Sequence, residues 1–270
     1  MIIDFHNHVW PDTIAPKALG GNIPGMQLFG DGTVSGLAAA QDAAGIDRSV
    51  CLAVANTAVQ LGPANLFVGS IDRSRFIPFG SVHPDASPEA NLAHLRDNQV
   101  QGVKLHPIFQ GYRLDDPRLM ETLAALEGEF CVIVHLGDGG GADGSSCTPA
   151  MAARVARTFP KLTLVACHFG GYHRLEESAA ELSGLHLLFD TSWPPTLAEL
   201  DPDLVRETIR RHGAEQVLFA SDWPTADPAA EIAAVRSLGL GEDELALILG
   251  GNACRVLGLD PSGYRPDRGT

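Results

Sequence analysis

Eight short apolar runs, distributed along the whole chain, constrain the fold more than any other feature of this sequence. They are rich in Val, Ile, Leu and Phe, and most are followed by a segment of helical character. Continuous apolar strands of this kind are typical of parallel sheets that helices cover on both faces. The predicted strands are residues 1–8, 49–55, 76–82, 100–106, 130–136, 162–168, 185–191 and 216–222.

Strands that alternate with helices predict an α/β protein with a parallel sheet. Eight such units in 270 residues favour a single-domain (β/α)8 TIM barrel, with a doubly wound open sheet as the alternative. Residues 1–259 are assigned to the barrel and residues 260–270 to a polar C-terminal tail. The predicted helices are residues 35–45, 64–74, 87–98, 117–128, 148–159, 172–182, 203–212, 228–238 and 243–257.

Composition and charge exclude several kinds of partner. The net charge of −14 is spread along the chain without a basic block, so nucleic acid is not expected to bind. No run of about eighteen apolar residues is present, so no membrane span is expected either. We expect a small-molecule substrate as the partner, and the oligomeric state stays open, with a homodimer as one option.

The cysteines and the start of the chain indicate the compartment. Five cysteines are an odd number, they form no CxxC pair, and several lie in apolar runs. Free cysteines packed in a core are typical of a reducing environment. Because the first strand begins by residue 2 and carries polar chemistry by His6, no signal peptide is expected. A cytoplasmic location follows as the expectation.

Polar residues stand at the ends of five of the predicted strands. They are His6, His8, His106, His135, His168 and Asp222. Because side chains alternate along a strand, His6 and His8 are expected to point the same way, with Asp4 beneath them. The C-terminal ends of barrel strands meet at one rim, where active sites of such barrels lie. Imidazole and carboxylate groups gathered there predict a divalent metal site.

The order of these motifs is similar to that of a known family. The chain resembles the amidohydrolase superfamily, in particular the amidohydrolase-2 branch typified by aminocarboxymuconate-semialdehyde decarboxylase and related metal-dependent hydrolases. The matching motifs are IDFHNHVWP, FIPFGSVHP, GVKLHP, VIVHLG, VACHFGG, LFASDWP and GGNACRVLGL. They extend from the first strand to Leu259, so the resemblance covers nearly the whole chain and also implies a TIM barrel.

The resemblance implies a ligand set for one metal ion. His6, His8, His135 and Asp222 would hold it, and His168 would be an unligated acid or base. Zn²⁺ is favoured by the histidine-rich donors, while Mn, Co and Fe also accept imidazole and carboxylate ligands. Asp222 is expected to act as a proton shuttle for an activated water as well as a ligand.

Lys104 and His106 share a face of the fourth predicted strand, with the lysine deeper in the barrel. Binuclear members of the superfamily bridge two metals with a carboxylated lysine on this strand, which is the minority interpretation of Lys104. A buried lysine needs a carboxylate partner or a depressed pKa. We therefore expect Lys104 to pair with Asp4, and His106 to support the ligands or to face the substrate.

Aromatic and cationic residues near the strand ends are candidates for substrate contact. Trp10, Trp193 and Trp223 each follow a strand end and would form apolar walls for a planar substrate. Arg113 and Arg174 follow strands four and six and are candidate clamps for a substrate carboxylate. The substrate-binding prediction therefore consists of His106, Lys104, Trp10, Trp223, Arg113 and Arg174.

Two glycine-rich segments are interpreted as loops. Residues 11–33 form a long connection of the kind that often carries function. Residues 139–144 match the pattern G-x-G-x-x-G, but the next helix begins only near Thr148 and no acidic residue ends the following strand. A nucleotide cofactor is therefore not expected.

The predicted activity is hydrolysis of a C–N or C–O bond in a small organic substrate by a metal-activated water. The alternative is non-oxidative decarboxylation of a small unsaturated or aromatic carboxylic acid at the same mononuclear site. Both reactions would use the same ligands, so the sequence does not separate them. A catalytically silent binding barrel is the third hypothesis, and the retained histidines and Asp222 argue against it.

Overall fold

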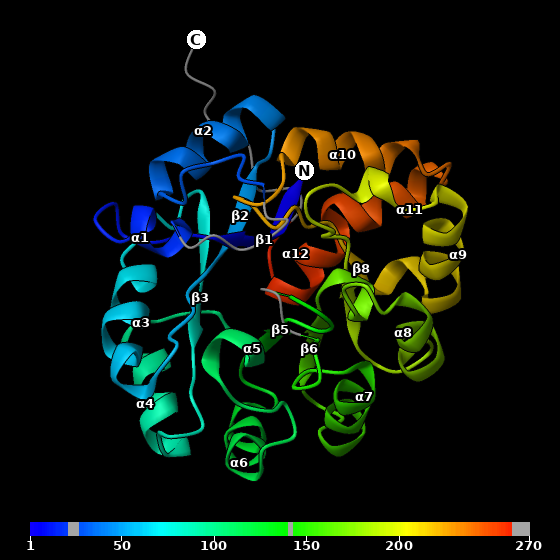
Figure 1. Ribbon diagram of the computed structural model, residues 1–270. Helices are drawn as coiled ribbons and strands as arrows, with labels where there is room; N and C mark the ends of the chain where they lie inside the picture. Colours follow the sequence, from blue (N-terminus) through cyan, green and yellow to red (C-terminus); the bar gives the residue numbers. More distant parts are fainter. Residues whose placement is uncertain (21–26, 140–142, 261–270) are drawn as a thin grey trace.

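Eight parallel strands follow one another in chain order around a nearly closed barrel (Figure 1). The computed structural model describes residues 1–20, 27–139 and 143–260. A doubly wound sheet would reverse its strand order, so the sequential order excludes that alternative. The strands are β1 Ile3–His8, β2 Arg48–Leu52, β3 Phe76–Ser81, β4 Gly102–Leu105, β5 Cys131–Val134, β6 Thr163–Ala166, β7 Leu188–Asp190 and β8 Val217–Leu218.

Backbone hydrogen bonds close the barrel between β1 and the segment that continues β8. Phe5 N donates to Phe219 O at 2.9 Å, and Asp222 N donates to His6 O at 2.9 Å. One residue further along, His8 N donates to Trp223 O at 2.7 Å. The first and last strands are therefore neighbours, which places His6 and Asp222 side by side although they are far apart in the sequence.

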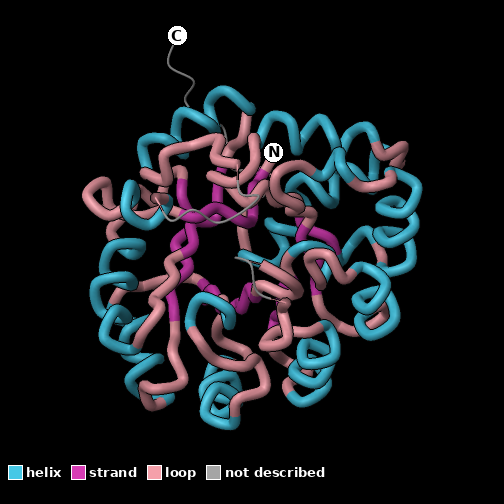
Figure 2. The backbone as a smooth tube through the Cα atoms, viewed as in Figure 1, coloured by secondary structure: helices cyan, strands magenta, loops and turns pink. Residues whose placement is uncertain are grey.

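Helices surround the strands, as Figure 2 shows by secondary structure. This arrangement confirms the single-domain TIM barrel. The helices are α1 Ala15–Leu19, α2 Val34–Ala44, α3 Leu61–Gly69, α4 Pro88–Asp97, α5 Pro107–Gln110, α6 Pro117–Leu126, α7 Pro149–Thr158, α8 Leu175–Leu182, α9 Pro202–His212, α10 Pro228–Ser237, α11 Glu242–Ala246 and α12 Asn252–Leu257. In the described ranges, no helix is both long enough and apolar enough to cross a membrane.

Five of the helices begin in the same way. In each, the side chain of a Ser, Thr or Asp accepts a hydrogen bond from a backbone N–H of the first turn, and a proline follows it. A capping side chain satisfies a free donor, and proline tolerates the first helical position because its nitrogen has no hydrogen to lose. The five pairs are Ser87-Pro88, Asp116-Pro117, Thr148-Pro149, Asp201-Pro202 and Asp227-Pro228.

Some predicted elements differ from the structure. The connection at residues 11–33 contains the short helix α1, and its residues 21–26 lie outside the described residues. The last predicted helix is divided into α11, a π-helical turn over residues 247–251, and α12. The eighth predicted strand is mostly irregular, since regular pairing covers only Val217–Leu218. The predicted tail lies outside the described residues from residue 261 onward.

Strand β1 is irregular at the point where it carries the first histidine. Its register with β2 shifts between Asp4 and Asn7, which indicates a β-bulge. Phe5 lies in an apolar cluster formed by strand residues and the end of α12, which is the interior of the barrel. His6 Nε2 nevertheless lies 3.2 Å from His8 Nε2, so the adjacent residues Phe5 and His6 both face inward.

The bulge places Asp4 on the other side of the sheet. Asp4 pairs in register with Ser49, whose hydroxyl accepts a hydrogen bond from Gln41 of the outer helix α2. Asp4 therefore lies between the barrel and its helices. The expectation that Asp4 lies beneath His6 and His8 is wrong, because simple alternation does not hold across a bulge.

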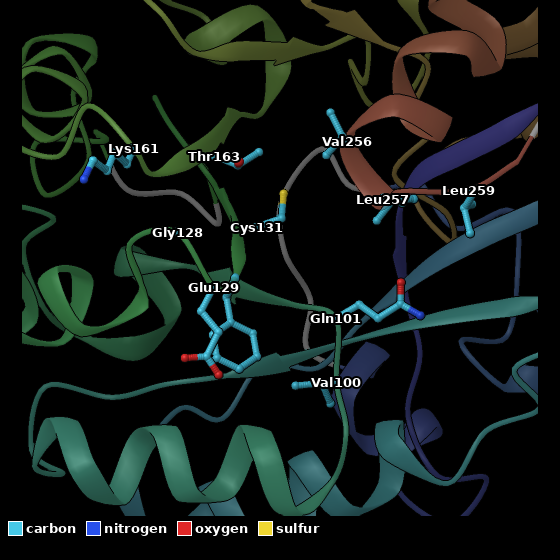
Figure 3. Close-up of a pocket in the computed structure, with 11 residues that line it drawn as sticks. Val100, Gln101, Gly128, Glu129, Cys131, Lys161, Thr163, Val256, Leu257 and Leu259 are labelled. Carbon is cyan, nitrogen blue, oxygen red and sulfur yellow. The ribbon is translucent and has the colours of Figure 1, made fainter.

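The amino end of the barrel is closed by α12. Cys254 and Ala253 of this helix pack against the interior cluster, with Val256 and Leu259 beside them. A cavity of about 620 Å³ remains between α12, the first residues of β5 and β6 and the residues that lead into β4, and Figure 3 shows Cys131 and Val256 in its lining. This cavity lies at the end of the barrel opposite to the predicted metal site.

Candidate metal centre

Three predicted ligands converge at the carboxyl end of the barrel. The Nε2 atoms of His6 and His8 lie 3.2 Å apart, and Asp222 Oδ1 lies 3.3 Å from the first and 3.6 Å from the second. His6 and Asp222 are buried, and His8 is nearly so. All three ligand atoms lie within 4.8 Å of one another, which is compatible with binding one metal ion.

The protonation of these groups fits a cation. Burial is the largest cause that lowers the pKa of both His6 and His8 well below the usual value, so both imidazoles are neutral. His6 Nδ1 lies 2.9 Å from Asp190 Oδ2, and a carboxylate there accepts the ring proton of Nδ1. The Nε2 atom of His6 therefore presents a lone pair, which is the state that binds a metal.

Asp222 is held in an unusual conformation. Its φ angle is +66°, in the left-handed region that few non-glycine residues adopt. Its carbonyl accepts hydrogen bonds from Thr225 N at 2.9 Å and Thr225 Oγ1 at 2.6 Å. Burial raises the pKa of Asp222 to about 8, and the Lys104 ammonium partly opposes this. A divalent cation beside the carboxyl group would likewise favour its charged form.

His135 and His168 form a second pair beside this group. His135 Nδ1 lies 3.0 Å from His168 Nε2, and His135 Nε2 lies 3.0 Å from the carbonyl of Asp138. His168 Nδ1 faces the carbonyl of Ser192 at 3.1 Å. The set of ligand atoms within 4.8 Å does not include His135, so its role as a fourth ligand stays a prediction.

The contacts of this pair need more protons than two neutral rings carry. The two carbonyls only accept, so each requires an N–H, and the contact between the rings requires a third proton. Burial lowers the pKa of His135 to about 3 and that of His168 well below its usual value, which favours two protons in total. One of the three contacts is therefore left without a proton, so at least one ring nitrogen keeps an unmatched lone pair, as a metal ligand would.

Lys104 does not pair with Asp4, and that prediction is wrong. Its Nζ atom lies 3.0 Å from His6 Nε2 and donates to Cys167 Sγ at 3.3 Å, inside the barrel. The Asp4 carboxylate instead accepts hydrogen bonds from Ser221 N at 3.0 Å and Ser221 Oγ at 2.6 Å. The two side chains are on opposite faces of the sheet because of the bulge in β1.

His106 is buried in a stack of rings. Its ring lies over Phe109 with centroids 3.9 Å apart and over His135 with centroids 4.3 Å apart. Within the described part of the chain, its Nδ1 atom is buried without a hydrogen-bond partner. His106 thus supports the face of a predicted ligand and leaves one polar atom for another group.

The three tryptophans predicted to contact the substrate differ in their exposure to solvent. Trp10 stacks on His8 with centroids 5.9 Å apart and is partly exposed, so it lies at the rim. Trp223 is 1% exposed, and Gly30 lies so close to its indole that a Cβ there would overlap the ring. Trp193 is buried beside Tyr172. Of the three, Trp10 is the one placed to meet a ligand.

The two candidate arginine clamps already have partners. Arg113 pairs with Asp115 at 2.9 Å and is more than half exposed. Arg174 pairs with Asp138 at 2.9 Å and with Glu177 at 3.1 Å, and it also donates to the carbonyl of Asp143. Binding a substrate carboxylate would require either guanidinium to exchange these contacts, and their clamp role stays a prediction.

Sequence reasoning missed three residues of the site, which are Cys167, Asp190 and Ser192. Asp190 contacts both His6 and the backbone of His168, and Cys167 contacts Lys104. The signal for Asp190 was present, because it stands near the end of an apolar strand, as the predicted ligands do. Cys167 and Ser192 carried no such signal.

Comparisons with known proteins agree with this architecture. A search of curated proteins found no significant sequence match. An uncharacterised TIM-barrel protein from Bordetella bronchiseptica superposes with a TM-score of 0.74 at 21% identity, covering 95% of this chain and 98% of that one. A dihydroxybenzoic acid decarboxylase from Polaromonas sp. JS666, with bound manganese and 2-nitroresorcinol, gives 0.71 at 15% identity, covering 95% and 96%.

A third similar structure carries the name of a hydrolase. A probable 2-pyrone-4,6-dicarboxylic acid hydrolase from Acinetobacter baumannii, with citric acid bound, gives a TM-score of 0.68 at 16% identity. It covers 96% of this chain and 99% of that one. At such identities these likenesses establish the fold. A family model described as amidohydrolase matches residues 3–259, almost the entire chain, so this protein belongs to the amidohydrolase-2 family.

Proposed function

We propose that this protein is a metal-dependent hydrolase that cleaves a C–N or C–O bond of a small organic substrate. The observation that carries the proposal is the convergence of His6 Nε2, His8 Nε2 and Asp222 Oδ1 within 4.8 Å. His6, His8 and Asp222 would hold the metal, with His135 as the fourth predicted ligand. When bound, such an ion polarises a substrate oxygen and lowers the pKa of a nearby water.

Asp222 and His168 would carry the protons of the reaction. Asp222 accepts a proton as the water oxygen forms its bond to the substrate carbonyl carbon. It then passes that proton to the leaving nitrogen or oxygen when the C–N or C–O bond breaks. Burial raises the pKa of Asp222 to about 8, and a bound cation would favour the carboxylate form that accepts this proton. His168 is close enough to His135 to orient the water or the substrate at the same rim.

Zinc is the proposed metal, because neutral imidazoles predominate among the donors. Manganese is the alternative, since the dihydroxybenzoic acid decarboxylase of the same fold has bound manganese. Metal analysis of the purified protein after supplementation tests the site itself. A content below about a tenth of an equivalent would favour the catalytically silent barrel.

Decarboxylation of a small aromatic or unsaturated acid is the second candidate. Several similar structures are named decarboxylases of aromatic acids, and the stacked rings of His106 and Phe109 suit a planar ligand. In this reaction the C–C bond that joins the carboxylate to a ring or alkene carbon breaks, and carbon dioxide leaves. A proton from His168 or Asp222 then takes its place on that carbon.

One experiment separates the two reactions. The metal-loaded protein is incubated with a panel of lactones and amides, and separately with enoic and hydroxybenzoic acids, while acid release and carbon dioxide release are followed. The hydrolase proposal expects turnover in the first panel that the variant Asp222→Asn lacks. Carbon dioxide release without hydrolysis would replace it with the decarboxylase.

A further inference from the structure

Asp190, the last residue of β7, is a buried carboxylate shared by two parts of the site. Its Oδ2 atom lies 2.9 Å from His6 Nδ1. Its Oδ1 atom accepts from His168 N at 2.7 Å, from Ser192 Oγ at 2.6 Å and from Ser192 N at 3.2 Å. Donor groups thus surround the carboxylate, and the proposed reaction gives it no step of its own.

The contact with His6 fixes which ring nitrogen carries the proton. A carboxylate only accepts hydrogen bonds, so the proton of neutral His6 lies on Nδ1. Lys104 gives independent support, because its ammonium only donates and it lies 3.0 Å from His6 Nε2. Both neighbours therefore leave a lone pair on Nε2, the atom that also lies 3.2 Å from His8 Nε2 and 3.3 Å from Asp222 Oδ1.

The other carboxylate oxygen restrains His168. This residue has a φ angle of +59°, a strained conformation for a histidine. Asp190 accepts its backbone N–H and also accepts the hydroxyl of Ser192. Because that hydroxyl donates to Asp190, its lone pairs accept from His168 Nδ1, which lies 2.9 Å away. Asp190 therefore restrains the backbone of His168, and through Ser192 it adds to the Ser192 carbonyl in favouring a proton on His168 Nδ1.

We propose that Asp190 is the positioning residue of this site, which orients a metal ligand and the neighbouring acid–base histidine at the same time. This inference rests on the proposed metal site. Carboxylates that accept the second N–H of a ligating histidine fix its orientation and increase its basicity. Asp190 itself does not bind the metal, although its carboxylate, His6 and Cys167 also lie within 4.8 Å of one another.

The substitution Asp190→Asn tests this role, because it keeps the size of the side chain and changes its donors. If the new amide NH₂ faces His6, it moves the ring proton to Nε2 and blocks the metal. If it faces His168, the NH₂ group meets two other donors, the His168 N–H and the Ser192 hydroxyl. The side chain at position 190 then no longer restrains His168. We expect the affinity for Zn²⁺, measured by calorimetry, to fall by on the order of 10–100-fold.

Two matched variants complete the test. Asp4→Asn also removes a fully buried carboxylate. Asp4 accepts from Ser221 and from the backbone of His6 but does not touch the His6 ring, so Zn²⁺ affinity should stay within about twofold of wild type. If Cys167 is not a metal ligand, the cobalt-substituted protein has no absorption band from a cobalt–thiolate bond to Cys167. The spectrum should therefore be the same in wild type and in Cys167→Ser. Equal affinities for Asp190→Asn and Asp4→Asn, or a sulfur band that Cys167→Ser removes, would overturn the inference.

A measurement on the wild-type protein keeps the inference testable if Asp190→Asn does not fold. Nitrogen NMR of the metal-free, histidine-labelled protein should show His6 protonated at Nδ1 and unprotonated at Nε2. A proton on Nε2 would overturn the assigned role of Asp190. Failure of wild type to bind Zn²⁺ at all would instead overturn the proposed function, and the inference with it.

Discussion

The two ends of the barrel interior use the same strands for opposite purposes. On β7, Leu188 belongs to the apolar interior cluster, and two residues later Asp190 accepts four hydrogen bonds. On β5, Ile133 lies in the same cluster, and His135 follows two residues later beside His168. A single step along each strand therefore separates the residues that stabilise the barrel from those that form the site.

Backbone strain follows the same division. Five non-glycine residues in the described ranges have positive φ angles, and four of them, His168, Phe169, His173 and Asp222, lie after strands β6 and β8 at the carboxyl end. Such conformations cost about 1–3 kcal/mol each and are retained where the surrounding contacts require them. The strained backbone conformations thus gather at the carboxyl end, where the site lies, and their cost is offset by packing elsewhere in the barrel.

The largest effect should come from removing a ligand at the carboxyl end. His6→Ala deletes an imidazole that contacts His8, Asp222, Lys104 and Asp190, so bound metal should fall below about a tenth of an equivalent. Metal analysis after dialysis measures this. His94→Ala, on the outer helix α4, is the control, and full metal retention by His6→Ala would contradict the assignment.

The two histidines of the second pair should respond differently to truncation. His135→Ala is expected to lose metal, since His135 is a predicted ligand. His168→Ala is expected to keep the metal and to lose turnover by about 10²–10⁴-fold, the usual contribution of a general acid or base. Metal content and kcat, measured on both variants, test this, and the opposite pattern would exchange the two roles.

Ionisation of a buried acid at the carboxyl end, outside the metal ligands, should lower the free energy of unfolding. Glu231 of α10 accepts from Leu197 N at 3.1 Å, and burial raises its pKa from 4.5 to about 7. A raised pKa in the folded state means that its contribution to stability is fully present below pH 4.5 and is lost as pH rises through 7. Glu231→Gln, which does not ionise, should therefore be more stable than wild type at pH 8 by up to about 3 kcal/mol.

Urea unfolding at pH 5 and pH 8 measures this difference. The stabilisation should be present at pH 8 and small at pH 5, where Glu231 is protonated in the folded protein. Glu242→Gln, an exposed residue at the start of α11, is the control and should change little at either pH. The same difference at both values of pH would show that the ionisation of Glu231 is not its cause.

The smallest effect is expected at the amino end. Val256→Leu adds one methylene group beside the cavity that Val256 lines, which should raise the free energy of unfolding by up to about 0.8 kcal/mol. Turnover should not change, because the cavity lies at the end away from the metal ligands. A change of several-fold in kcat would show that the two ends are coupled, and the comparison would then fail.

Local patterns were enough to predict most of the framework. The apolar runs predicted all eight strands, and capping residues followed by proline marked helix starts such as Ser87-Pro88 and Thr148-Pro149. His6, His8 and Asp222 could be placed together because the ends of parallel strands in a barrel meet at one rim. These features depend on residues close in sequence and on one general property of the fold.

The sequence by itself determined the strands, the helix starts and the histidines and aspartate at the strand ends. Only the tertiary structure decided which of them touch. The bulge in β1 separates Asp4 from Lys104, and Lys104 instead reaches His6. Asp190 gains its role because β7, far away in the sequence, ends at the height of His6. Contacts of this kind depend on register and side-chain direction across strands, which no local pattern of residues encodes.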